Sequence, residues 1–91
     1  MYEVLLSGVD ETGASAVLYA QHFRQRQFVV AQVDITDTAT VQVQGRIGPD
    51  FDWVILYEFT ASGAQQVTAM SQMRFEVTAY TGGTVDAGLA G

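Results

Sequence analysis

Apolar and polar residues alternate with a period of two through much of this chain, and the alternation predicts β-strands. The clearest cases are residues 40–47, 73–81 and 84–89, in which every second side chain is apolar. A strand that buries one face has this pattern because successive side chains point to opposite faces of the sheet. We therefore expect these three segments to be half-buried strands.

Other segments have the composition of strands but a less regular pattern. Residues 2–8, 27–35 and 65–70 alternate over part of their length, whereas residues 51–60 are apolar on both faces. We expect residues 51–60 to be covered on both sides or to lie at a subunit contact, with Trp53 in the core, where a tryptophan within a strand is most often found. Residues 14–20 fit either a strand or a short helical turn.

Turn-forming residues separate these segments at regular intervals. Glycine, proline, aspartate or serine falls at residues 10–13, 48–50, 61–63 and 82–83. Strands that recur about every 8–12 residues are typical of a sandwich or barrel. The sequence therefore predicts one all-β domain over residues 1–91, an antiparallel two-sheet β-sandwich that is jelly-roll-like, with seven to eight short strands. Jelly-roll and immunoglobulin-like strand orders both remain open.

Composition and charge narrow the classes of function. The chain has 91 residues and no cysteine, which excludes disulfides and thiolate metal sites. It has ten acidic residues, four arginines and no lysine, and its net charge of −6 repels phosphate backbones, so we expect no direct nucleic-acid partner. No apolar run approaches the ~20 residues that cross a membrane, and we expect neither a membrane partner nor a secretory leader.

The candidate chemical groups do not form a catalytic constellation. His22 is the single histidine, and no serine lies in a Gly-x-Ser-x-Gly turn, so we expect His22 at a surface or interface. Asp50 and Asp52 could serve a glycosidase or ligate calcium, but the chain is short for a large cleft and lacks a full calcium loop. We expect them to lie in a solvated turn, and we expect no enzyme activity, no cofactor and no metal.

Residues near the start of the segment 27–35 are candidates for a protein interface. Arginine suits interfaces because its planar guanidinium binds carboxylates in a bidentate manner. The aromatic side chains exceed what one small core holds, and exposed aromatics mark protein contacts. The predicted interface residues are Phe23, Arg24, Arg26, Phe28, Val30 and Tyr80.

The second half of the chain resembles a known group of proteins. A strand containing Gly45-Arg46 is followed by a turn and then by Asp52-Trp53, which leads an aliphatic strand. Next come Phe-Thr-Ala-Ser-Gly over residues 59–63 and the hairpin Arg-Phe-Glu-Val-Thr-Ala-Tyr-Thr-Gly-Gly-Thr-Val over residues 74–85. This order, which covers about half of the chain, resembles small virion structural proteins of tailed bacteriophages, in particular capsid decoration (cement) proteins.

The resemblance implies a role without a catalytic residue. It implies a protein present in many copies that binds the major capsid protein lattice, commonly as homotrimers, and stabilises the mature head. Its place would be the capsid surface of the virion, after assembly in the host cytoplasm. The alternative is a carbohydrate- or host-surface-binding β-sandwich module of a phage tail or capsid. That module would use Trp53 or Tyr80 for stacking and Asp50 or Asp52 for hydroxyls or calcium.

Overall fold

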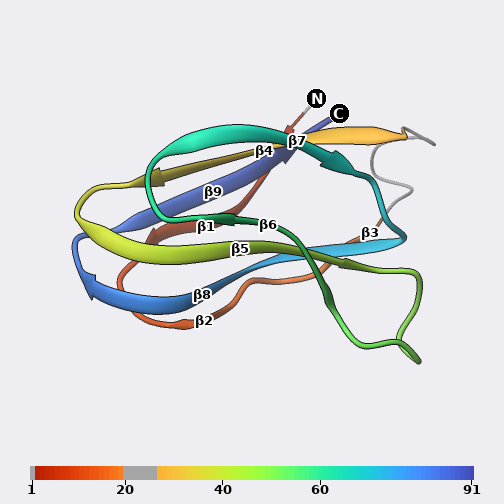
Figure 1. Ribbon diagram of the computed structural model, residues 1–91, viewed down its shortest axis with the longest axis horizontal. Helices are drawn as coiled ribbons and strands as arrows, with labels where there is room; N and C mark the ends of the chain where they lie inside the picture. The colour runs from red at the N-terminus through yellow and green to blue at the C-terminus, as the bar shows by residue number, and fades with distance from the viewer. Residues whose placement is uncertain (1, 20–26) are drawn as a thin grey trace.

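A computed structural model describes residues 2–19 and 27–91 and shows an all-β sandwich (Figure 1). The described residues form two antiparallel sheets, which confirms the predicted fold class. The strands in these residues are β1 (Tyr2–Val9), β2 (Gly13–Ala14), β3 (Leu18–Tyr19), β4 (Phe28–Ile35), β5 (Thr38–Arg46), β6 (Val54–Phe59), β7 (Gly63–Thr68), β8 (Gln72–Gly82) and β9 (Val85–Ala90).

The strand order is that of a jelly roll. One sheet, here sheet A, has the order β1-β9-β4-β7, and the other, sheet B, has the order β2-β8-β5-β6, with β3 also paired to β8. Strands pair as nested antiparallel partners: β1 with β9, β2 and β3 with β8, β4 with β7, and β5 with β6. This nesting distinguishes a jelly roll from an immunoglobulin-like sandwich. The described strands number nine because residues 14–20 contribute to two short strands instead of one.

The core lies between the two sheets and is built from the alternating apolar positions. The predicted inward faces of residues 29–33, 73–77 and 85–89 are buried, which confirms the period-two pattern in these segments. The buried apolar side chains are Leu6, Val29, Ala31, Val33, Ala39, Val41, Val43, Phe59, Val67, Met73, Phe75, Val77, Val85, Ala87 and Leu89.

A register shift in β8 reverses the faces expected near its end. The pairing with β5 shifts by one residue between Thr40 and Val41. A bulge of this kind moves all following side chains to the opposite face. Ala79, predicted to point inward, is therefore exposed, whereas Tyr80 pairs with Ala39 and packs against the core. The alternation over residues 73–81 places Ala79 inward and Tyr80 outward, and this expectation was wrong because of the bulge.

A second shift changes the faces of β1. Tyr2, Val4 and Leu6 alternate in sequence and were expected to share one face. The pairing of β1 with β9 shifts between Val4 and Leu6, so Leu6 is buried while Tyr2 and Val4 are exposed. The shift leaves two apolar side chains on the outer face of sheet A.

One glycine allows a close approach inside sheet B. A Cβ atom built on Gly45 would lie 2.8 Å from Sδ of Met70 and 3.1 Å from Cδ1 of Leu56. Both side chains are partly buried and pack against the core. Glycine at this position therefore lets the Met70 and Leu56 side chains pack directly on the β5 backbone.

Removing the ring at the centre of the core tests this packing. Phe75 is fully buried between the sheets. We expect Phe75→Ala to lower the free energy of unfolding by about 3–5 kcal/mol, because it removes apolar contacts and leaves a cavity. Urea denaturation measures this change.

The matched control is Phe51→Ala, because Phe51 is 56% exposed. We expect this surface substitution to change the free energy of unfolding by no more than about 0.5 kcal/mol. Equal losses in the two variants would contradict the assignment of the core.

Candidate interaction surface

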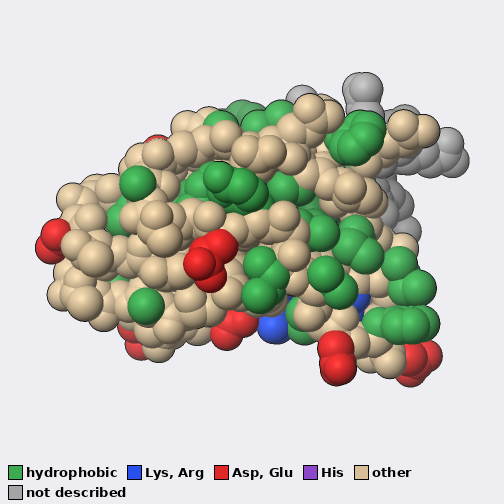
Figure 2. Space-filling model, in the orientation of Figure 1, with side chains coloured by type: hydrophobic (Ala, Val, Ile, Leu, Met, Phe, Trp, Pro, Cys, Tyr) green, Lys and Arg blue, Asp and Glu red, His purple; other side chains and the backbone are tan. Residues whose placement is uncertain are grey.

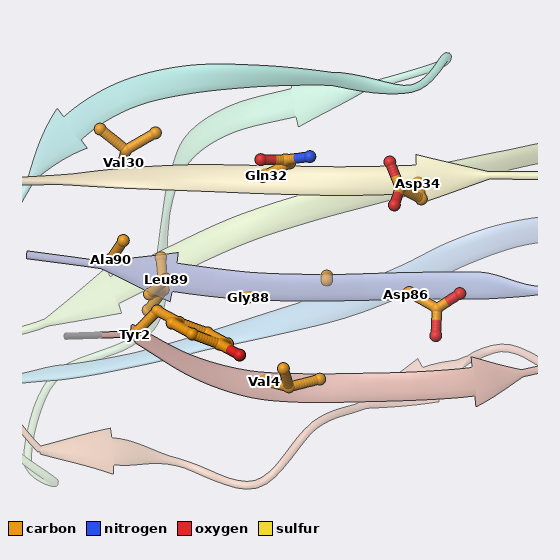
Figure 3. A pocket seen from close by; sticks show the side chains of 10 residues that line it. Tyr2, Val4, Val30, Gln32, Asp34, Asp86, Gly88, Leu89 and Ala90 are labelled. Carbon is orange, nitrogen blue, oxygen red and sulfur yellow. The ribbon is translucent and has the colours of Figure 1, made fainter.

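The outer face of sheet A is hollowed into an open groove of about 430 Å³ (Figure 3). The groove follows β9, where Gly88 lies between Val4 of β1 and Gln32 of β4 in the sheet register. Because Gly88 has no side chain, its larger neighbours form the walls. A Cβ atom at Gly88 would lie 2.8 Å from the carbonyl oxygen of Glu3, so glycine also permits the close approach of β1 and β9.

One end of the groove is apolar. The Tyr2 ring extends from β1 along β9 towards Gly88, and Val4 lies beside it (Figure 3). Val30 and Ala90 line the same end and are directly opposite each other in the β4–β9 pair. Tyr2 is 73% exposed, so its ring contributes apolar surface that the fold itself leaves in water.

The other end of the groove is acidic. Asp34 and Asp86 are cross-strand partners of β4 and β9 and lie side by side (Figure 3). Asp86 also fixes the nearby end of β1, since its Oδ1 accepts a hydrogen bond of 2.8 Å from the Gly8 N–H. Gln32 lies between this acidic end and the apolar end. The groove therefore combines an aromatic surface with hydrogen-bonding side chains.

The outer face of sheet B carries Trp53 on two arginines. The guanidinium carbon atoms of Arg46 and Arg74 lie 4.2 and 4.3 Å from the centroid of the Trp53 ring. These distances fit cation–π contacts. Trp53 is half-buried on this outer face and precedes β6, so the expectation of a core tryptophan was wrong. The two arginines on neighbouring strands provide a surface on which the ring packs.

A network of side-chain hydrogen bonds surrounds these arginines. Gln44 is only 4% exposed, and its Oε1 accepts a hydrogen bond of 2.7 Å from Nε of Arg74. Its Nε2 donates bonds of 2.9 Å to Gln42 and to Glu76. Arg46 Nε donates a bond of 2.7 Å to Gln72. These side chains form hydrogen bonds between β5 and β8, and the bonds stabilise the pairing of the two strands.

Apolar side chains also gather at the β5–β6 end of the molecule. In Figure 2 they form a cluster at the lower right, with acidic side chains beside it. We call the exposed apolar residues in and beside the β5–β6 connection the hairpin surface; they are Ile47, Phe51, Val54 and Ile55, each more than half exposed. Asp50 and Asp52 are exposed in the same connection, as expected for a solvated turn.

The structure brings together only part of the predicted interface. Phe28 and Val30 are exposed on the outer face of sheet A, beside β7. Tyr80 belongs to sheet B, and its hydroxyl donates a hydrogen bond of 2.6 Å to the Gly83 carbonyl. The remaining predicted positions, which lie outside the described residues, are Phe23, Arg24 and Arg26, together with His22.

Sequence reasoning did not place Tyr2 and Val4 in this surface. Their alternation showed that they share a face, but only the strand order brings β1 beside β9 and β4. The additional signal was Gly88, since a glycine inside a strand indicates a close backbone approach.

In residues 2–19 and 27–91, no group of three or more histidine, cysteine, aspartate or glutamate side chains is arranged to hold a metal ion. Those same residues include no helix long and apolar enough to cross a membrane. Comparison of the chain with known protein families, curated proteins and solved structures gave no match.

The Trp53 contacts give a measurable contribution to stability. We expect Trp53→Ala to lower the free energy of unfolding by about 1–2 kcal/mol, because each of two cation–π contacts contributes roughly 0.5–1 kcal/mol. Trp53→Phe, which keeps a smaller aromatic ring, should fall between this variant and the unchanged chain. Thermal denaturation followed by circular dichroism measures both. Unchanged stability in Trp53→Ala would contradict a stabilising role for the stack.

Proposed function

We propose that this chain is a structural protein of a tailed-bacteriophage virion, a capsid decoration protein that binds the major capsid protein lattice and stabilises the mature head. The observation that carries this proposal is the large apolar surface outside a complete core. In the described residues, ten large apolar side chains are at least 42% exposed, although fifteen other apolar side chains already form a buried core. Exposed apolar clusters mark protein contacts.

The residues that carry the resemblance contact one another in the structure, and this supports the proposal. Arg46, Trp53 and Arg74 come from three separate parts of the motif and form one stack on sheet B. Gly45, adjacent to Arg46, admits Met70 against the β5 backbone. The resemblance therefore rests on residues that shape this half of the sandwich together.

The hairpin surface is the contact that we assign to the capsid lattice. It lies at one end of the molecule, whereas the groove lies on the face of sheet A (Figures 2 and 3). Fully burying one large apolar side chain contributes roughly 1.5–3 kcal/mol. Many copies on one lattice, linked to one another, would add such modest contacts through avidity.

Binding to empty shells tests this function. We expect the purified protein to bind empty expanded shells of the matching phage and to raise their melting temperature. Ile47→Asp should weaken binding at least about tenfold, since it places a charge in the apolar contact and ~1.4 kcal/mol corresponds to a factor of ten. Ile47 is 59% exposed, so the fold should tolerate the change.

The matched control places the same charge in the exposed β1–β2 turn. Thr12→Asp should leave shell binding unchanged. An absence of binding to the matching shells would reject the proposal, and equal binding by both variants would reject the hairpin surface as the contact.

The alternative, a carbohydrate-binding module, is favoured by the groove of sheet A. An aromatic ring beside hydrogen-bonding side chains suits a sugar, and Tyr2 lies in one groove with Gln32, Asp34 and Asp86. The platforms expected from the sequence are engaged elsewhere, since Trp53 contacts two arginines and Tyr80 bonds Gly83. Glycan-array binding that Tyr2→Ala abolishes would support this alternative; no binding would exclude it.

A further inference from the structure

The two sheets have four edges, and three of them carry features that prevent pairing with another chain. An edge strand exposes unpaired N–H and C=O groups, which natural proteins protect with bulges, charges or very short strands. β1 has two register shifts, and β6 has one shift and carries Glu58. β2 and β3 have two residues each.

The fourth edge, β7, has none of these features. Its residues Gly63–Thr68 pair with β4 in an uninterrupted register over six residue pairs. The sequence of β7, Gly-Ala-Gln-Gln-Val-Thr, contains no charge and no proline. β7 is therefore the one edge in the described chain that is regular, uncharged and long enough to accept another strand.

We propose that β7 pairs antiparallel with β7 of a second copy of this chain, about a two-fold axis at Gln66. The pairing joins two copies of sheet A into one continuous sheet. It goes beyond the proposed function, because a two-fold contact makes pairs of chains, whereas the resemblance to decoration proteins implies homotrimers. We assign the partner to a second copy because the other edges of the sandwich are bulged or short. Among the edges in the described residues, only β7 has a regular backbone, so the matching regular edge is β7 of another copy.

The hydrogen bonds of β7 identify the groups that point outward. The Ala69 N–H donates to the Gln27 carbonyl at 2.9 Å, so these two residues form a hydrogen-bonded pair. Bonded and non-bonded pairs alternate along an antiparallel ladder. The backbone groups of Ala64, Gln66 and Thr68 therefore point away from β4.

Most of these outward groups lack a partner within the described residues. There, the Gln66 carbonyl accepts a bond of 3.2 Å from the Gln65 side chain, and the outward groups of Ala64 and Thr68 have no hydrogen bond. Antiparallel pairing about Gln66 places Ala64 opposite Thr68 of the second copy. Each such pair exchanges two backbone hydrogen bonds.

The absence of charge on β7 and the apolar surface beside it both favour this contact. Each copy carries a net charge of −6, so two copies repel each other, and the repulsion is smallest where the surfaces that meet are uncharged. No like charges face each other along β7, where such pairs destabilise a sheet. Phe28, which is 52% exposed and pairs with Thr68, would come near Ala64 of the second copy and lose contact with water.

A single cysteine tests the two-fold axis directly, because the chain has no cysteine of its own. Opposite residues of a bonded antiparallel pair have Cα atoms about 5.5 Å apart, within the range that a disulfide spans. We expect Gln66→Cys to form covalent pairs of chains on mild oxidation. The matched control is Ser7→Cys on the bulged β1 edge, which should remain mostly a single chain.

Sedimentation velocity and native mass spectrometry provide the second measurement. We expect the unchanged chain to form pairs and Gln66→Lys to weaken them at least tenfold, because two like charges would then face each other at the axis. Gln66→Pro should also weaken the pairs of chains. It should leave the β4–β7 pairing intact, since the Gln66 N–H points away from β4. Ser7→Lys should leave the pairs intact.

Three results would overturn the pairing: a single chain at every concentration, pairs that survive both substitutions at Gln66, or three-chain clusters that survive them. The last two leave the proposed function standing, because the copies would then associate through another surface. Pairs that Gln66→Lys dissociates, in a protein that does not bind shells, would support this contact and reject the capsid function.

Discussion

The structure depends on one constraint, which is that the backbone N–H and C=O groups of every strand need partners. The nested pairing of the jelly roll meets this need for the inner strands and brings the two ends of the chain together, with β1 beside β9. That pairing places Gly88 between Val4 and Gln32 and so creates the groove on sheet A. The same constraint leaves the outer side of each edge strand open.

The outer faces of the two sheets differ in how many of their polar groups are hydrogen-bonded. On sheet B, Gln44 and its partners bond one another, and Trp53 covers the two arginines. On sheet A, Tyr2 and Val30 are left in water, and Val30 lies next to β7, whose outward backbone groups are mostly unused. This difference supports the assignment of contacts between copies to sheet A. It leaves the hairpin surface available for a different partner.

The sequence predicted the inner strands well because their faces follow from local alternation. Residues 29–33 and 85–89 alternate as the buried strands β4 and β9 do. The faces of Leu6 and Tyr80 could not be predicted in this way, since a bulge depends on the partner strand and leaves no mark in the alternation. Trp53 was misplaced because its arginine partners come from two other strands.

The groove and the β7 edge could be predicted only from the strand order, which the alternation of apolar and polar residues does not reveal. The groove joins residues from β1, β4 and β9, and β7 becomes an edge only because β4 separates it from β9. The predicted residues Phe28 and Val30 lie next to this edge, but their neighbours across the sheet were not evident from the sequence.

Amide hydrogen exchange at two protein concentrations tests most directly whether the outward edge of β7 pairs with β7 of a second copy. The informative amides are those of Ala64, Gln66 and Thr68, which point away from β4. We expect their exchange to slow markedly as the concentration rises, while exchange at the bulged β1 edge stays constant. Fast exchange of these three amides at every concentration would contradict pairing between copies through β7.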